Sequence, residues 1–402
     1  MRILAITNLY PRPGHERMAA FNRQQFRALA ERHELRVIAP VPWQEVLKDR
    51  LTGRATPSHY INGDGIHVDH PIFYYLPRVR SHRWGEYYLR SIRPIVERRI
   101  EQFRPDVMLA CWAHPDGWAT VKLARQAGLP VVVKVIGSDV LVLTRQPRRL
   151  EPISRTLQQA SAVVAVSRDL AQHAERLGAE PFRVHVVPEG TNRELFAPGS
   201  KAEARQRLNL TPDRPIILFV GNLLESKGAA LLIEACRLLR NEGTQGFQCY
   251  LIGSGRDAGK LRRLIARYTL SDCVSLPGPC AQTCLPDWYR ASDVVALPSF
   301  SEGIPNVLRE ALECGRPFVA TRVGGIPEIS HPSYSRLVER GDVRALAVAL
   351  AENLESPTAV DPTLVRLCNL SCQESAARFA DVLATAVAER RPNPAPSPRS
   401  RA

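Results

Sequence analysis

Runs of apolar residues alternate with amphipathic helical patterns along almost the whole chain. In the first half, helical periodicity occurs at 19–32, 86–103, 117–127 and 169–177, and we expect strands at 2–7, 35–39, 107–111, 131–135, 162–166 and 184–187. Apolar strands that alternate with helices are typical of a parallel sheet covered by helices. The pattern therefore predicts an α/β fold with a doubly wound sheet in this half.

The same pattern starts again in the second half, with strands at 216–220, 248–252, 293–297 and 317–320 and helices at 228–241, 257–268 and 305–313. A chain of 402 residues is too long for one compact core and suits two domains. We therefore expect an N-terminal domain over 1–197, a linker over 198–204, a C-terminal domain over 205–370, a final helix over 371–389 and a disordered Pro- and Arg-rich tail over 390–402.

The segment 294–329 carries the strongest chemical signal. A buried strand leads into a loop that holds Glu302, and Pro305 then takes the first position of a helix that contains Glu310. Ligands of open α/β sheets bind at the carboxyl ends of the strands, and a helix start attracts anions such as phosphate. A carboxylate beside that helix start can accept hydrogen bonds from a vicinal diol such as a ribose. The combination predicts a nucleotide-sugar site.

A second group of candidate residues follows the first two strands of the same half. Gly221 and Asn222 end the strand at 216–220, and Lys227 comes at the start of the next helix. A lysine in that place can neutralise a diphosphate leaving group as a point charge. Gly253 and Gly255 form a turn after the next strand.

The glycine turn admits two other interpretations. Gly253-x-Gly255-x-x-Ala258 satisfies a loose dinucleotide fingerprint, so a nicotinamide-dependent oxidoreductase is a competing hypothesis. That fingerprint normally follows the first strand of its domain, whereas this one follows the second. A phosphate-binding P-loop is excluded because Leu261, and not Ser or Thr, follows Lys260.

The motifs of the second half resemble those of a known family. Glu302-Gly303-x-Pro305 followed by Glu310-Ala311, Gly315-x-Pro317 and Gly324-Gly325-x-Pro327-Glu328 resembles the two-glutamate region of retaining glycosyltransferases of family 4. The resemblance implies the GT-B fold, in which two Rossmann-like domains face each other across a cleft. It covers nearly the whole chain to about residue 388 and is strongest over 216–329.

The resemblance implies a division of labour between the domains. The C-terminal domain would bind a nucleoside-diphosphate sugar and the N-terminal domain an acceptor hydroxyl, with retention of anomeric configuration and without a metal or other cofactor. His114 would face the transferred sugar and act with Lys227 and Glu302 in catalysis, and Asp139 would lie on the acceptor side. The residues expected to bind the donor are Gly221, Asn222, Lys227, Gly253, Gly255, Glu302, Gly303, Ile304, Pro305, Asn306 and Glu310.

The sequence also departs from the family pattern. Asn222 stands where the family commonly has an arginine that holds the diphosphate together with the lysine. Glu189 and Asn192 replace the usual Asn and Asp of the segment that crosses between the domains, and the first loop, 8–20, lacks the family's glycine pair. These departures leave open an alternative, a catalytically silent sugar-nucleotide-binding or scaffold subunit.

Charge and composition bear on the cellular location of the protein. The formal net charge is +14, and residues 1–200 carry 29 Lys and Arg against 19 Asp and Glu. There is no window of eighteen uncharged apolar residues and no secretory signal, and the nine cysteines show no zinc-ligand spacing. We therefore expect a cytoplasmic protein. Peripheral attachment to the inner face of the membrane is compatible with this expectation.

The basic excess of the first half is concentrated between Arg78 and Arg104. This stretch holds eight arginines against three glutamates, interleaved with Trp84, Tyr87, Tyr88 and several aliphatic residues. A basic amphipathic segment with aromatic residues suits an anionic membrane that carries a lipid-linked acceptor. An ordinary surface helix that packs its apolar side on the sheet is equally compatible. Nucleic acid is not expected as a partner, because no known binding module accompanies the charge. We expect the partners to be a nucleotide sugar and a carbohydrate or lipid-linked acceptor.

Overall fold

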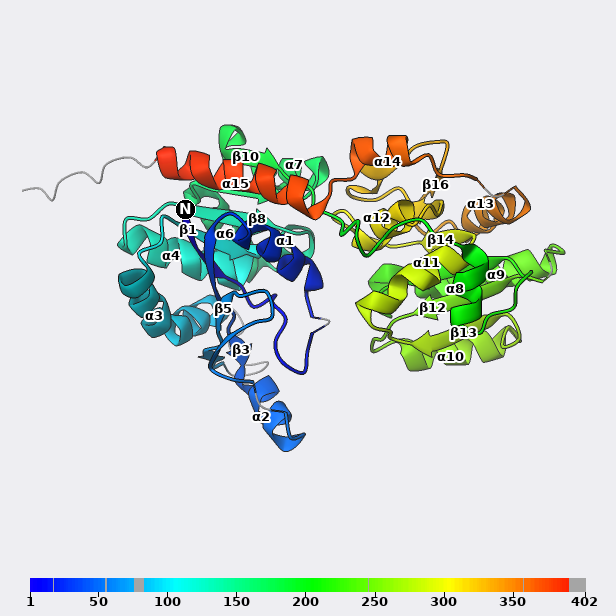
Figure 1. Ribbon diagram of the computed structural model, residues 1–402, viewed down its shortest axis with the longest axis horizontal. Helices are drawn as coiled ribbons and strands as arrows, with labels where there is room; N and C mark the ends of the chain where they lie inside the picture. The colour runs from blue at the N-terminus through cyan, green and yellow to red at the C-terminus, as the bar shows by residue number, and fades with distance from the viewer. Residues whose placement is uncertain (17, 55, 76–82, 245, 357, 390–402) are drawn as a thin grey trace, which may run out of the picture. The chain divides into compact units, whose positions relative to one another are not determined.

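A computed structural model describes the chain except for residues 17, 55, 76–82, 245, 357 and 390–402. The chain forms two compact units, shown in Figure 1. Unit 1 comprises residues 1–165, 171–187 and the chain from Ala376 onward, and unit 2 comprises residues 166–170 and 188–375. Apart from the short segment 166–170, the chain passes from unit 1 to unit 2 after residue 187, and the sequence suggested a boundary after residue 197.

Unit 1 is built on a sheet with the strand order β10-β9-β8-β7-β1-β2-β5-β4. All neighbouring strands of this sheet are parallel except β4 and β5, which are antiparallel. A short parallel pair, β3 and β6, lies outside it. The strands are β1 (Arg2–Ile6), β2 (Glu34–Ile38), β3 (Val41–Pro42), β4 (His59–Ile61), β5 (His67–Asp69), β6 (Ile72–Phe73), β7 (Val107–Cys111), β8 (Val131–Val135), β9 (Ala162–Ala165) and β10 (Val184–Val186).

The helices of unit 1 cover strands that are buried at every residue, such as β7 and β8. One layer consists of α3, α4 and α6, which contact one another in that order, and α1 packs beside β2. The helices are α1 (Ala20–Ala30), α2 (Trp43–Leu51), α3 (Trp84–Phe103), α4 (Trp118–Gln126), α5 (Ser138–Leu141), α6 (Pro147–Gln159), most of α7 (Arg168–Arg176) and, from Ala376, α15 (Cys372–Ala388).

Unit 2 contains a fully parallel sheet with the order β13-β12-β11-β14-β15-β16. Its strands are β11 (Ile216–Val220), β12 (Gln248–Ile252), β13 (Val274–Gly278), β14 (Val294–Leu297), β15 (Phe318–Thr321) and β16 (Ser335–Val338). Helices α9, α10 and α13 pack together as one group, and α8, α11 and α12 as another. The helices are α8 (Lys201–Arg207), α9 (Ala229–Asn241), α10 (Ala258–Arg267), α11 (Leu285–Ala291), α12 (Asn306–Glu313), α13 (Val343–Glu355) and α14 (Pro362–Cys368).

The strand order of unit 2 reverses between β11 and β14. From β11 the chain moves outward to β12 and β13, then returns to the other side of β11 and continues through β14 to β15 and β16. The loops after β11 and β14 therefore leave the sheet in opposite directions. Such a switch point is where open α/β sheets bind their ligands, at the carboxyl ends of the strands.

The α/β class and the parallel sheets in two domains confirm the fold predicted from the sequence. Two local expectations differ. Pro305 is the N-cap of α12 and Asn306 its first residue, so the helix begins one residue later than expected. Part of the expected linker, 198–204, is helical, because α8 starts at Lys201 with Ser200 as its side-chain cap. The predicted tail, 390–402, lies outside the described residues. No helix in the described chain is both long and apolar enough to span a membrane.

The turns after β11 and β12 approach each other more closely than side chains allow. Gly253 has φ +150°, and a Cβ atom on it would lie 1.8 Å from the carbonyl oxygen of Gly221. Hydrogen bonds from Gly221 N to the Ile252 oxygen and from Leu223 N to the Ser254 oxygen join the two turns. The glycine at 253 is therefore required by packing between the loops at the carboxyl edge of the sheet.

Gly253→Ala should destabilise unit 2 by about 2 kcal/mol or more, because the added methyl group collides with backbone and the backbone angle is unfavourable. Gly259→Ala is the matched control, since a Cβ atom on this α10 residue meets no atom within 4 Å. We expect the control to unfold at or above the wild-type temperature, because alanine favours helices. Equal thermal midpoints for the two variants, measured by circular dichroism, would contradict the packing argument.

Candidate active site

An ion pair lies at the switch point of the unit 2 sheet. The Lys227 ammonium donates to both carboxylate oxygens of Glu302, at 2.7 and 2.8 Å. Lys227 ends a short 3₁₀ turn between β11 and α9, and Glu302 lies in the loop between β14 and α12. The lysine side chain is 28% exposed and the glutamate only 7%. The pair therefore presents its cation to solvent and its anion to the interior.

The loop that carries Glu302 is fixed by polar contacts beneath it. Ser299 donates its hydroxyl to Glu302 Oε1 at 2.7 Å, and Thr321 donates to the Ser299 carbonyl. The Gly325 N–H donates to the Gly303 carbonyl at 2.7 Å. Gly324 has φ +52°, and a Cβ there would lie 1.9 Å from the Glu302 carbonyl oxygen. Glu302 is thus held in one place, which makes it a pre-positioned group.

Helix α12 begins directly after this loop and lacks a side-chain cap. Its N-cap is Pro305, whose ring offers no oxygen to the first N–H groups. Ile304 and Pro305 are buried, whereas Asn306 and Val307 are half-buried. The uncapped N–H groups and the helix dipole favour an anion at this end of α12.

Glu310 lies farther along α12 and is buried. It accepts a hydrogen bond of 2.8 Å at Oε2 from the hydroxyl of Tyr289 in α11. Burial raises the pKa of the Glu310 carboxyl to about 7, although the Tyr289 hydroxyl and the neighbouring Arg309 guanidinium oppose the rise. The charge of Glu310 therefore changes in the physiological range of pH.

The other residues expected to bind the donor border the same edge of the sheet. Gly221 follows β11 and is half-buried, and the side chain of Asn222 is exposed. Gly253 and Gly255 follow β12 and pack closely against the backbone of the turn at 221–223. The structure thus gathers the loops after β11, β12 and β14 at one edge of the sheet. Direct contact of each residue with a donor stays a prediction.

His114 occupies a corresponding position in unit 1, after β7. It lies in the irregular helical turn Ala113–Gly117, is 2% exposed and follows a buried strand. Burial, with a smaller contribution from the Arg149 guanidinium, lowers the pKa of the imidazole to about 4. His114 is therefore neutral at physiological pH. Its ring lies edge-on to Trp118, with 6.4 Å between the centroids.

Asp139 supports the loop that carries His114. Its fully buried carboxylate accepts hydrogen bonds from the Ala113 N–H at 3.1 Å and from the Gly137 N–H at 2.8 Å. Burial raises the pKa of its carboxyl. In this structure Asp139 therefore holds backbone, and the acceptor contact expected of it stays a prediction.

Three polar residues that lie close to the candidate residues, in space or in sequence, were not identified from the sequence. Ser299 lies three residues before Glu302 and donates to it, and Tyr289 of α11 donates to Glu310. Asp116 lies two residues after His114. It accepts a hydrogen bond of 2.8 Å from the Tyr88 hydroxyl, and burial raises the pKa of its carboxyl to about 7. Hydroxyl partners of this kind depend on tertiary contacts. Only the short spacing to Glu302 and His114 could have drawn attention to Ser299 and Asp116.

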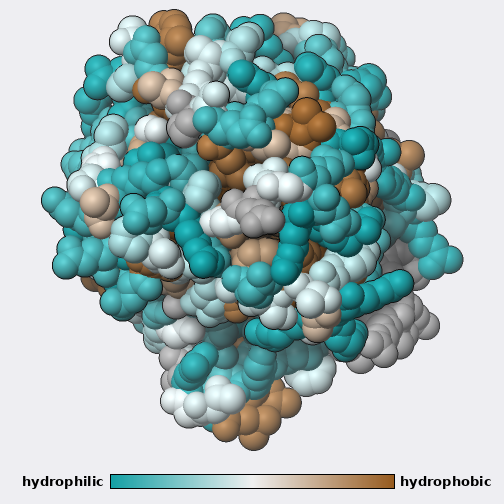
Figure 2. Space-filling view, turned by 90° about the vertical axis from the view of Figure 1, so that its right-hand side faces the viewer, coloured by the Kyte–Doolittle hydropathy of each residue, from teal (hydrophilic) through white to brown (hydrophobic). Residues whose placement is uncertain are grey.

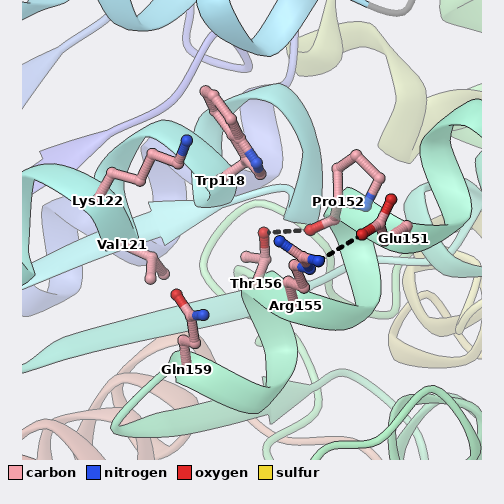
Figure 3. A pocket seen from close by; sticks show the side chains of 8 residues that line it. All are labelled: Trp118, Val121, Lys122, Glu151, Pro152, Arg155, Thr156 and Gln159. Carbon is pink, nitrogen blue, oxygen red and sulfur yellow. Dashed lines mark hydrogen bonds and ion pairs between the residues drawn. The ribbon is translucent and has the colours of Figure 1, made fainter.

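Figure 3 shows a separate surface pocket of unit 1, between α4 and α6, with a volume of about 200 Å³. The Lys122 ammonium lies over the Trp118 ring at 3.7 Å, and Arg155 is paired with Glu151 at 2.6 Å. The cations of this pocket thus already have partners. None of the residues predicted to be functional lines it.

The basic segment expected to meet a membrane corresponds largely to α3. Tyr88, Ile92 and Val96 are buried, whereas Arg90 and Arg98 are exposed. The helix therefore packs its apolar side inward, as the alternative of an ordinary surface helix predicted. Arg78 and Arg80 lie outside the described residues.

Comparison with known proteins identifies the class of this fold and site. Residues 214–356 match the family profile described as "Glycosyl transferases group 1", and residues 18–190 match the "Glycosyl transferase 4-like domain". The chain is 32% identical over 295 residues to a D-inositol 3-phosphate glycosyltransferase of Streptosporangium roseum, covering 68% of this chain and 67% of that protein. The chain belongs to the group 1 glycosyltransferases of the family 4 type and is a hexosyltransferase-type enzyme.

A second relative is similar along more of its length. The chain is 28% identical over 360 residues to the provisionally named teichuronic acid biosynthesis glycosyltransferase TuaC of Bacillus subtilis (strain 168), covering 87% of this chain and 88% of that one. Other D-inositol 3-phosphate glycosyltransferases match over little more than half of their length. The family assignment sets aside the nicotinamide-dependent oxidoreductase.

Solved structures show the same fold. Sucrose-phosphate synthase from Thermosynechococcus elongatus superposes with a TM-score of 0.74 at 22% identity, covering 96% of this chain and 97% of that one. Anabaena Alr3699/HepE in complex with UDP-glucose superposes with a TM-score of 0.73 at 18% identity, covering 96% and 100%. At these identities the likeness defines the GT-B fold.

Proposed function

We propose that this enzyme transfers a sugar from a nucleoside-diphosphate sugar to an acceptor hydroxyl and retains the anomeric configuration. The observation that carries the proposal is the Lys227–Glu302 pair at the switch point of the unit 2 sheet. This edge of the sheet combines a half-exposed cation, an uncapped helix start and a fixed carboxylate. The combination suits a ligand with an anionic diphosphate flanked by groups rich in hydroxyls.

Lys227 would hold the diphosphate. In the free enzyme Glu302 orients the ammonium, and the lysine has three N–H donors, so it can bind phosphate oxygens while Glu302 stays close. The uncapped N–H groups at the start of α12 would add donors. Both would stabilise the negative charge that develops on the leaving phosphate. Because Asn222 brings no charge, Lys227 would supply most of the cationic stabilisation.

Glu302 and the backbone of Gly303 and Ile304 would face the sugar, since they lie between Lys227 and the start of α12. Glu310 would accept both ribose hydroxyls, with Tyr289 bonded to one of its oxygens. In unit 1 the neutral His114 would face the transferred sugar. We propose that no metal ion or other cofactor is required.

The names of similar proteins support the donor and the setting of this proposal. HepE was solved in complex with UDP and with UDP-glucose, and TuaC is named for teichuronic acid biosynthesis. We therefore propose a nucleotide-activated hexose as donor and a role in cell-envelope polysaccharide or glycolipid synthesis. A carbohydrate or lipid-linked acceptor at the inner face of the membrane would fit that role.

Lys227→Ala should weaken the binding of a nucleoside diphosphate by about tenfold or more, because a charged hydrogen bond to phosphate is lost. Binding of the nucleoside without phosphates should change little. Calorimetry with UDP and uridine, and with the guanosine and adenosine pairs, measures both. Lys260→Ala, at an exposed lysine of α10, is the control and should bind all ligands as wild type does. An equal loss for nucleoside and diphosphate would rule out a phosphate contact.

Nucleotide affinity should increase with pH through the titration of Glu310. The ribose hydroxyls donate to the carboxylate, and because the pKa is raised to about 7 in the free enzyme, the carboxyl is mostly protonated at pH 6 and mostly ionised at pH 8. Affinity should therefore rise about tenfold over this range. Glu310→Gln should bind about 1.5–3 kcal/mol more weakly at pH 8 and lose this rise. Glu352→Gln, at an exposed residue of α13, should keep it. A pH profile of Glu310→Gln parallel to that of wild type would exclude the ribose contact.

Transfer from an α-linked donor should give an α-linked product, and chelators should not change its rate. NMR of the product linkage, after a screen of donors and acceptors, decides the stereochemistry. A β-linked product would refute retention. Nucleotide binding without any hydrolysis or transfer across the screen would favour the catalytically silent subunit instead.

A further inference from the structure

Helix α2 of unit 1 carries two acidic residues, Glu45 and Asp49, that pair with the first loop of the chain. The buried Arg12 guanidinium pairs with Asp49 at 3.3 Å and with Glu45 at 3.2 Å, and His15 Nε2 lies 2.8 Å from the second oxygen of Asp49. Asp49 is only 3% exposed. The first loop of the chain, which carries Arg12 and His15, therefore neutralises the acids of α2 and fixes the helix.

The outer side of α2 has the opposite character. Leu47 is 49% exposed and Leu51 79% exposed, and Lys48, Arg50 and Arg54 are also exposed. Figure 1 shows α2 projecting from the body of unit 1, and the lowest part of the surface in Figure 2, where this helix lies, carries a brown patch beside teal residues. The projection thus combines exposed leucines with cations, whereas Asp49 is buried and Glu45, whose side chain is 45% exposed, is paired with Arg12.

The spacing of the two leucines makes them one surface. Residues four apart lie one above the other on a helix, so Leu47 and Leu51 share a face, and the cations flank it. Helix α3 differs, because Tyr88, Ile92 and Val96 are buried and its other large aliphatic and aromatic side chains are buried or half-buried. Of these two helices, α2 is the one whose large aliphatic side chains are exposed and can insert into a bilayer.

We propose that the outer end of α2 and the turn that follows it, residues 47–54, dock unit 1 on an anionic lipid bilayer. Leu47 and Leu51 enter the interfacial region, and Lys48, Arg50 and Arg54 bind lipid phosphates. A second copy of the chain fits this surface less well, because a two-fold contact would bring the same cations together. The inference concerns attachment alone and does not depend on the transfer reaction.

Sedimentation of the full-length protein with lipid vesicles tests the proposal without donor or acceptor. Wild type should bind vesicles that contain phosphatidylglycerol, bind pure phosphatidylcholine much more weakly, and release as salt increases. Leu47→Ser with Leu51→Ser should lower the partition coefficient at least about tenfold. Each change of Lys48, Arg50 or Arg54 to Gln should lower it about fivefold.

Matched control variants distinguish binding through the α2 surface from nonspecific binding through other exposed leucines or arginines. Leu367→Ser alters a leucine of α14 in unit 2 that is 81% exposed, and Arg90→Gln with Arg98→Gln alters exposed arginines of α3. We expect these to bind as wild type does, with unchanged thermal midpoints for every variant. The proposal is overturned if wild type does not bind anionic vesicles at low salt, if the controls lose as much as the α2 variants, or if light scattering shows a dimer that Leu47→Ser dissolves.

Discussion

The arrangement of unit 2 depends on placing one lysine and one glutamate side by side where the sheet reverses its strand order. Lys227 and Glu302 come from loops that leave β11 and β14 in opposite directions, and the parallel strands bring them within hydrogen-bond distance. A largely buried carboxylate is costly unless it is paired and hydrogen-bonded. Lys227 supplies the pairing and Ser299 the additional hydrogen bond. As a result, the Glu302 carboxylate is largely buried and the Lys227 ammonium is the more exposed of the two groups. An accessible cation of this kind is what a diphosphate requires.

Burial sets the protonation of the other candidate groups. The carboxyl of Glu310 and the imidazole of His114 are both shifted toward their neutral forms, the first to a pKa of about 7 and the second to about 4. A neutral His114 can donate or accept a hydrogen bond without carrying charge near a sugar. Glu310 accepts hydrogen bonds best when its carboxyl is ionised. Hydrogen bonds from a bound diol favour the ionised form, whereas an apolar site without a ligand does not. The two units thus use burial in different ways, one to keep a group neutral and one to hold it near its titration point.

Much of this arrangement could be predicted from the sequence because it follows from local pattern. The strands β7, β8, β11 and β14 are short apolar runs, and Lys227, Glu302 and Glu310 come in the segments that follow β11 and β14. The minor strands β3 to β6 and helix α2 could not be predicted, because they are short, mixed in composition and stabilised by distant partners such as Arg12 with Asp49. The partners Tyr289 and Ser299 were missed for the same reason. The glycine pair Gly253 and Gly255 was interpreted as a nucleotide contact, whereas the structure adds a packing reason that only the neighbouring loop reveals.

The central claim is that the edge of the unit 2 sheet at Lys227 and Glu302 is the donor site. A crystal structure of the enzyme with a nucleoside diphosphate that binds it tests this claim most directly. The account predicts phosphate oxygens within about 3 Å of Lys227 Nζ and near the start of α12, and ribose hydroxyls on Glu310. A nucleotide bound elsewhere, with Lys227 still paired only to Glu302, would contradict the account.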